Sequence, residues 1–169
     1  MEIAVRFLGT RPRTRWELTR RLRRGGAAPE VIDGTLERLA ELGYVDDFAF
    51  ARWWMEERDR HAPRGRRMVE AELRQRGVQR EVIESLRGEE PEPAASPPDG
   101  EGLPSTEGER ARIALGRHLR GRPLPTDQRA LQRVGMFLVR RGFDPETVRR
   151  ALREAAESHD QGDEPVDDD

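Results

Sequence analysis

Arginine is the residue type most able to do chemistry in this chain, in which all 31 of the Lys and Arg residues are arginine. The absence of lysine suits recognition of oxyanions, and codon preference in a GC-rich genome explains it equally well. On a helical projection, Arg20, Arg23 and Arg24 lie opposite the apolar pair Leu18 and Leu22. A guanidinium keeps its charge and binds the oxygens of phosphate or carboxylate in pairs. The segment therefore predicts a helix whose outward face binds an anionic partner, with a merely solvated face as the alternative.

A second helix of the same kind is predicted about 50 residues further along the chain. Val69 and Leu73 form its apolar stripe, and its arginines lie on the opposite side. Two such helices could line a basic groove for phosphates or acidic side chains. The candidate residues for binding a partner or DNA are Arg13, Arg20, Arg23, Arg24, Arg64, Arg67 and Arg74.

Catalytic chemistry finds no support in the residue pattern. The chain has no cysteine, and its three histidines, at 61, 118 and 159, have no spacing typical of a ligand set or an acid–base pair. The phosphate-binding patterns GxxxxGK[ST] and GxGxxG do not occur. Asp46 and Asp47 are interpreted as a helix cap and a first-turn carboxylate rather than a metal site. We therefore predict no catalytic residue, no metal and no cofactor.

Three degenerate repeats organise the chain. The segment 26–32 matches 77–83 at an offset of 51 residues, and 142–148 follows the same pattern at an offset of 116. No alternating strand pattern occurs, so we predict an all-α fold of three tandem three-helix repeats. The expected helices span residues 2–9, 14–25, 29–42, 47–61, 64–76, 80–87, 107–121, 126–141 and 145–157.

Polar caps and glycines define the expected helix ends. Thr14, Asp46 and Asp144 are suited to cap helix N-termini. Glycines that follow helices favour left-handed C-caps, and they stand at 25, 26, 43, 77 and 142. Phe50 and Trp54 are four residues apart, which favours core packing over base stacking.

The third repeat departs from the other two. Met136 and Val139 occupy the positions that Arg20 and Arg23 hold in the first repeat. Its second helix is therefore apolar over most of its circumference. We expect this second apolar side to pack against neighbouring helices, and a contact surface for a partner is the alternative.

Charge is strongly segregated along the chain. Residues 1–87 carry a net charge of +4, 88–109 carry −7, 110–153 carry +9 and 154–169 carry −8. The acidic, proline-rich segment that begins at residue 88 has no apolar periodicity and is predicted to be a disordered linker. The expected division is 1–43 for repeat 1, 44–87 for repeat 2, 88–106 for the linker, 107–157 for repeat 3 and 158–169 for an acidic tail. The chain shows no signal-peptide or membrane-span pattern, so a cytoplasmic location is expected.

The stretch Leu42–Ala51, which reads LGYVDDFAFA, resembles the characteristic motif of the RecX family. The upstream RTRWEL of residues 13–18 resembles the family's first repeat, and the downstream ELRQRGV of residues 72–78 resembles its second. The resemblance covers residues 2–87 well and residues 107–155 more loosely.

This resemblance implies an elongated, curved array of three-helix repeats that is not an enzyme. It implies a monomeric regulator that binds the RecA filament on DNA and modulates filament extension, ATP hydrolysis and strand exchange, with inhibition the expected effect. The partners implied are the RecA filament and single- or double-stranded DNA. A stand-alone DNA-binding protein built of helix-turn-helix-like units is the alternative.

Overall fold

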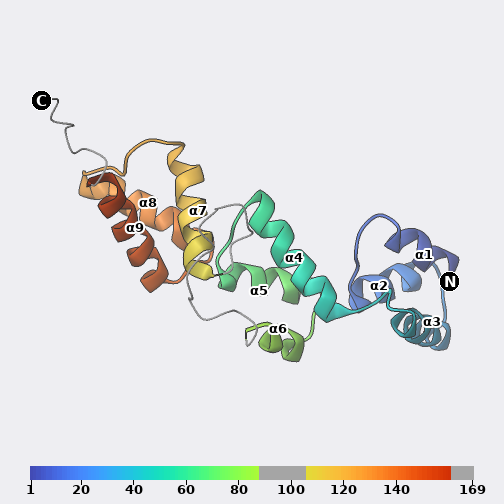
Figure 1. The fold of residues 1–169 in the computed structure, drawn as a ribbon. Coiled ribbons are helices and arrows are strands. Elements are labelled where there is room, and N and C mark those ends of the chain that lie inside the picture. The colour runs from blue at the N-terminus through green and yellow to red at the C-terminus, as the bar shows by residue number, and fades with distance from the viewer. Residues whose placement is uncertain (88–105, 161–169) are drawn as a thin grey trace, which may run out of the picture. The chain divides into compact units, whose positions relative to one another are not determined.

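The computed structural model describes residues 1–87 and 106–160, and all regular structure in these ranges is helical (Figure 1). The all-α prediction is confirmed, and each expected helix has a counterpart whose bounds agree within three residues. The predictions for the linker and the acidic tail fall mostly on residues 88–105 and 161–169, which lie outside the described residues. The helices are α1 (Glu2–Leu8), α2 (Arg15–Arg24), α3 (Pro29–Glu41), α4 (Asp47–His61), α5 (Arg66–Gln75), α6 (Arg80–Arg87), α7 (Glu107–Leu119), α8 (Gln128–Arg140) and α9 (Pro145–Asp160).

The described residues divide into two compact units. Unit 1 contains residues 1–56 and 70–87, and unit 2 contains residues 57–69 and 106–160. Helices α4 and α5 each contribute residues to both units.

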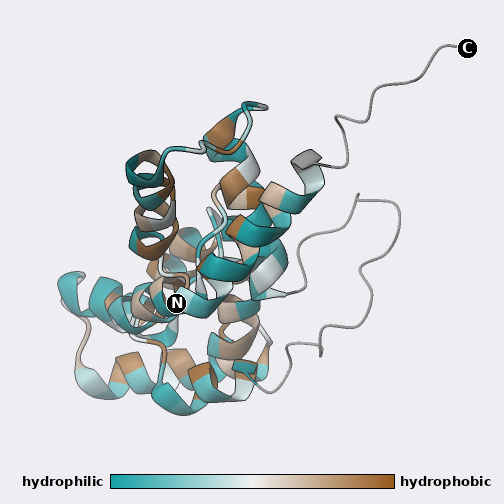
Figure 2. Cartoon of the chain, turned by 90° about the vertical axis from the view of Figure 1, so that its left-hand side faces the viewer, coloured by the Kyte–Doolittle hydropathy of each residue, from teal (hydrophilic) through white to brown (hydrophobic). Residues whose placement is uncertain are grey.

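Amphipathic helices build the first part of unit 1. Figure 2 shows that hydrophobic and hydrophilic residues both occur along the helices, as expected for elements with one buried face. Leu18 and Leu22 of α2 are buried with Ile32, Leu36 and Leu39 of α3. Full burial of one such side chain contributes about 1.5–3 kcal/mol, so this cluster is the main force that pairs α2 with α3.

Aromatic rings lie at the centre of the second part of unit 1. Phe50 and Trp54 are 2% and 8% exposed, and their rings stack with centroids 6.1 Å apart. The indole Nε1 of Trp54 donates a 2.8 Å hydrogen bond to Oε2 of Glu72. Leu73 and Ile83 are buried as well. The prediction that Phe50 and Trp54 pack in a core is confirmed.

Unit 2 has its own hydrophobic core. Leu115 of α7, Leu138 of α8 and Val148 of α9 are buried in one cluster with Phe143. The guanidinium of Arg110 is buried too, and its Nε donates a 3.1 Å hydrogen bond to Oδ2 of Asp59. Removing one partner of such a buried pair typically costs about 3–5 kcal/mol, so this pair helps to hold α7 against the end of α4.

The expectation for the apolar side of α8 is wrong. Met136 is 45% exposed and Val139 is 39% exposed, although both were expected to pack against neighbouring helices. Val134 and Leu138 already fill the core-facing side of α8. Because the core contacts only that side of α8, Met136 and Val139 on the other side stay exposed.

The predicted caps are confirmed. Thr14 accepts a hydrogen bond from the backbone of Glu17, and Asp46 and Asp144 accept hydrogen bonds from backbone N–H groups of the helices that follow them. Among the predicted C-cap glycines, four adopt positive φ angles, between 73° and 89°, and they are Gly26, Gly43, Gly77 and Gly142.

Gly77 has a second reason to be glycine, and this gives a test of the packing in unit 1. A Cβ at residue 77 would lie 2.3 Å from Cβ of Trp16, whereas a Cβ at Gly26 would meet nothing within 4 Å. Both glycines have nearly the same φ, 77° and 79°. We predict that Gly26→Ala costs about 1–2 kcal/mol from backbone strain alone. Gly77→Ala should cost about 1–3 kcal/mol more, because the start of α2 must also shift to relieve the clash with Cβ of Trp16.

Urea denaturation followed by tryptophan fluorescence measures this difference, because all three tryptophans, at 16, 53 and 54, lie in unit 1. Equal losses of stability in the two variants would contradict the close approach of Gly77 to Trp16.

Candidate partner-binding surface

Helix α2 presents three of the candidate arginines on its exposed side. Arg20, Arg23 and Arg24 are exposed, whereas Leu18 and Leu22 on the opposite side are 0% and 4% exposed. The guanidinium of Arg20 lies 4.6 Å from the centre of the Trp16 ring. Within the described ranges, no carboxylate forms an ion pair with any of the three arginines. This face can therefore bind an anionic partner without first breaking an internal ion pair.

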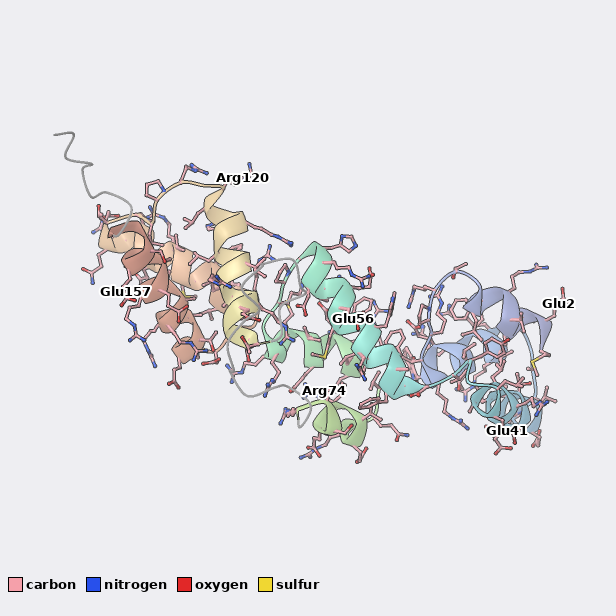
Figure 3. The ribbon with its side chains drawn as sticks, in the orientation of Figure 1. Glu2, Glu41, Glu56, Arg74, Arg120 and Glu157 are labelled. Carbon is pink, nitrogen blue, oxygen red and sulfur yellow. The ribbon has the colours of Figure 1, made fainter. Side chains whose placement is uncertain are left out.

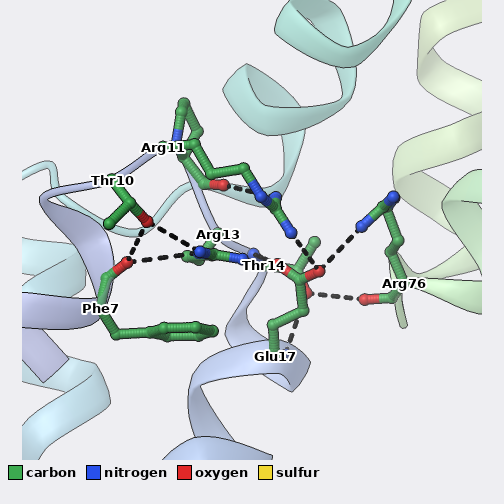
Figure 4. Close-up of polar contacts among 8 residues, drawn as sticks. Phe7, Thr10, Arg11, Arg13, Thr14, Glu17 and Arg76 are labelled. Carbon is green, nitrogen blue, oxygen red and sulfur yellow. Dashed lines mark hydrogen bonds and ion pairs between the residues drawn. The ribbon is translucent and has the colours of Figure 1, made fainter. Parts of the chain in front are cut away.

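Arg13 lies in a different environment, which Figure 4 shows in close-up. Its Nη2 donates a 2.8 Å hydrogen bond to Oγ1 of Thr10, and its Nε donates a 3.3 Å bond to the carbonyl of Phe7. The guanidinium also stacks 3.9 Å from the centre of the Phe7 ring. Burial lowers the pKa of Arg13, and the positive charge of Arg11 lowers it further. Arg13 therefore ties together the connection between α1 and α2.

A capping box fixes the start of α2 (Figure 4). Oγ1 of Thr14 accepts the backbone N–H of Glu17 at 3.1 Å, and the Glu17 carboxylate accepts the N–H of Thr14 at 3.4 Å. The Thr14 hydroxyl also donates a 2.7 Å hydrogen bond to the carbonyl of Arg76. Oε1 of Glu17 lies 3.0 Å from guanidinium nitrogens of both Arg11 and Arg76. These bonds join the start of α2 to the end of α5.

The aspartate pair before α4 contributes to the same frame. Oδ1 of Asp46 caps α4, and Oδ1 of Asp47 accepts the backbone N–H of Arg15 at 2.8 Å. Burial raises the pKa of Asp47, and the bond from Arg15 opposes that rise. The pair therefore serves two helix N-termini, α4 and α2. Spacing along the chain gave no signal for the contact with α2.

The candidate arginines in α5 and in the segment just before it differ in their exposure. Arg67 is exposed, whereas Arg64 is half-buried. Burial lowers the pKa of Arg64, and the charges of Arg58 and Arg141 add to this effect. Arg74 is 54% exposed, and its Nη2 lies 2.8 Å from Oε2 of Glu70. Arg64 and Arg67 belong to unit 2 and the other five candidates belong to unit 1, so the seven do not form one site within a single unit.

A basic cavity in unit 2 was missed by the sequence interpretation. It has a volume of about 500 Å³, and the ring of Phe137 forms part of its wall. The run RHLRGR at residues 117–122 is the sequence signal for this cavity, but it lies at the end of α7 and not in the second helix of a repeat. The charged and titratable residues lining the cavity are His61, Arg117, His118, Arg120, Arg122 and Arg141.

Residues 1–87 and 106–160 contain no group of three or more histidine, aspartate or glutamate side chains placed to hold a metal ion. No helix in these ranges is both long enough and apolar enough to cross a membrane.

The fold and the arginine-rich surfaces define an all-helical protein built from three-helix units, with cationic faces available to a partner. Three family models match the three-helix units in sequence order. The first three-helix domain of RecX matches residues 1–39, the second matches residues 46–85 and the third matches residues 107–152. The chain belongs to the RecX family.

Relatives and solved structures agree with this assignment. The regulatory protein RecX of Thermobifida fusca is 39% identical over 160 residues, covering 92% of this chain and 78% of the relative. The regulatory protein RecX of Prosthecochloris aestuarii is 34% identical over 154 residues, covering 89% of each chain. The crystal structure of RecX from Lactobacillus salivarius shares the fold, with a TM-score of 0.71 and 15% identity over 90% of this chain and 91% of that one.

The Thr14 hydroxyl is predicted to be the strongest single polar contribution to the position of α2. Thr14→Ala removes an N-cap, which costs about 1 kcal/mol, and leaves the Arg76 carbonyl without its bond, which costs about 1–3 kcal/mol more. Thr14→Ser keeps the hydroxyl and should lose less than about 1 kcal/mol. Urea denaturation followed by tryptophan fluorescence compares the two variants. If serine is no better than alanine, the hydroxyl does not have this role.

Proposed function

We propose that this protein is a non-enzymatic regulator that binds the RecA filament on DNA and inhibits filament extension, ATP hydrolysis and recombination. Membership of the RecX family supports the proposal, since the relatives are named regulatory proteins. In this proposal the protein acts in the cytoplasm as a monomer. Its effect comes from binding, so it needs no cofactor.

The observation that carries the proposal is the exposed arginine face of α2. Arg20, Arg23 and Arg24 point away from a buried leucine stripe and have no described carboxylate partner. A nucleoprotein filament offers both phosphates and acidic side chains, and a guanidinium binds either in pairs of hydrogen bonds. We assign these three residues to the main contact with the filament.

The remaining candidates have smaller parts in this proposal. Arg67 and Arg74 are exposed and would add contacts from α5. Arg13 and Arg64 are less exposed, and Arg13 holds α1 to α2. Replacing Arg13 would therefore weaken binding through misplacement of α2 rather than through loss of a direct contact.

The test measures RecA-dependent ATP hydrolysis on single-stranded DNA with the full-length protein added at stoichiometric amounts. Wild-type protein should lower the hydrolysis rate. The variant Arg20→Ala/Arg23→Ala/Arg24→Ala should lose most of this inhibition, and it should co-sediment with filaments at least tenfold more weakly. Each lost charge-assisted contact typically contributes about 1 kcal/mol or more, which together exceeds a tenfold change.

The matched control is Arg6→Ala/Arg38→Ala/Arg80→Ala. It removes the same charge from exposed positions of unit 1 that pair with carboxylates of their own helices. This control should inhibit like the wild type. An equal loss in both variants would mean that net charge, and not the α2 face, governs binding. Tight, salt-sensitive binding to duplex DNA without any effect on RecA would instead favour a stand-alone DNA-binding protein.

A further inference from the structure

The basic cavity of unit 2 contains two guanidinium groups fixed in place. Arg117 donates 3.2 Å hydrogen bonds from Nη1 to the carbonyl of His61 and from Nη2 to the carbonyl of Arg60. Nη1 of Arg141 donates a 3.3 Å bond to the carbonyl of Pro63. Carbonyl oxygens orient these cations without neutralising them, and no described carboxylate forms an ion pair with Arg117 or Arg141. Fixed, uncompensated cations are suited to hold an anion.

Two further arginines lie in the turn after α7. Arg120 has a left-handed conformation with a φ of 53°, and it is the one non-glycine residue with positive φ in the described ranges. This conformation costs a residue with a Cβ about 1 kcal/mol or more. Arg120 and Arg122 are both exposed, and Figure 3 shows Arg120 at the end of α7. Arg120 is the left-handed C-cap of α7, and this position sets its side chain in the wall of the cavity.

An aromatic pair lies beside these cations. The ring of His118 stacks on Phe137 with centroids 3.9 Å apart and planes 16° from parallel. The guanidinium of Arg141 lies 4.7 Å from the centre of the same Phe137 ring. One face of the His118 ring is covered by Phe137, and the residue is nevertheless exposed. Among the lining residues, His61 has a carboxylate neighbour, since its Nε2 lies 3.5 Å from Glu57.

We propose that this cavity binds a nucleotide. Arg120 and Arg122 hold its phosphate oxygens beside the fixed guanidinium of Arg117, and its base stacks on the exposed ring of His118. A volume of about 500 Å³ lies within the usual range for small-molecule sites, about 300–1,000 Å³. Stacking of a base on an aromatic ring typically contributes about 1–3 kcal/mol. The proposal goes beyond filament regulation, because it uses none of the arginines of α2.

Phosphate and base together are the ligand chemistry, and two sources can supply them. One is a free nucleotide, and the other is one nucleotide unit of a single strand. Isothermal titration calorimetry distinguishes the two sources. The full chain is titrated with ATP, with inorganic triphosphate and with a five-residue thymidine oligonucleotide. We expect ATP or the oligonucleotide to bind. If the ligand is ATP, it should bind at least fivefold more tightly than inorganic triphosphate. Stronger binding of ATP would identify a free nucleotide, and stronger binding of the oligonucleotide would identify a strand.

Variants test the assigned residues. Arg120→Asn/Arg122→Gln should weaken binding at least tenfold, and asparagine tolerates the left-handed conformation of residue 120. His118→Ala should weaken ATP or oligonucleotide binding at least fivefold and leave triphosphate binding unchanged. The control Arg112→Gln/Arg149→Gln removes the same charge from exposed positions of α7 and α9 and should bind like the wild type. Thermal unfolding verifies that every variant is folded.

The proposal would be overturned if neither ATP nor the oligonucleotide binds the wild type, or if triphosphate binds as tightly as the tighter of these two ligands. Equal weakening by the two double variants would also overturn it, since that result indicates a non-specific response to charge. The titrations contain no RecA, so their outcome is independent of the test of filament regulation.

Discussion

One contact between consecutive repeats recurs in the structure, and it sets the start of α2 and the start of α5. The start of α2 meets the turn after α5 in unit 1, where Thr14 donates its hydroxyl hydrogen bond to the carbonyl of Arg76. The start of α5 meets the turn after α8 in unit 2, where the N–H of Gly65 donates a 2.9 Å bond to the carbonyl of Arg141. Both turns end in a left-handed glycine, Gly77 or Gly142, against which the other helix packs. The approach is close at both turns. A Cβ added to Gly142 would lie 2.6 Å from Cβ of Met68, and a Cβ added to Gly77 would lie similarly close to Trp16.

The sequence predicted the parts of this arrangement that depend on local chemistry. Thr14 was expected to cap α2, and Gly77 and Gly142 were expected to end helices, because these preferences come from a few neighbouring residues. The second role of each residue was not predictable. The bond from Thr14 to Arg76 joins residues 62 positions apart, and nothing in the spacing of side chains along one helix indicates such a partner.

The same distinction between local pattern and tertiary contact separates the candidate arginines whose exposure was predictable from those whose contacts were not. Arg20, Arg23 and Arg24 lie on the exposed side of α2 because helical periodicity places them opposite Leu18 and Leu22, and this required only the sequence. Periodicity could not show that Arg13 stacks on Phe7. Nor could it show the basic cavity, because its lining comes from α4, α7, α8 and the turn after α7, which only the folded chain brings together.

Arginine does two different jobs in a chain that has no lysine. Arg76 and Arg110 serve the frame, since Arg76 pairs with Glu17 and Arg110 pairs with the buried Asp59. Charges engaged in this way have little left to offer an external anion, because a partner would first have to displace a carboxylate. The guanidinium groups of α2 and of the turn after α7 carry no such internal pairing in the described ranges. One set belongs to unit 1 and the other to unit 2, so each cationic surface is positioned by the packing of its own unit.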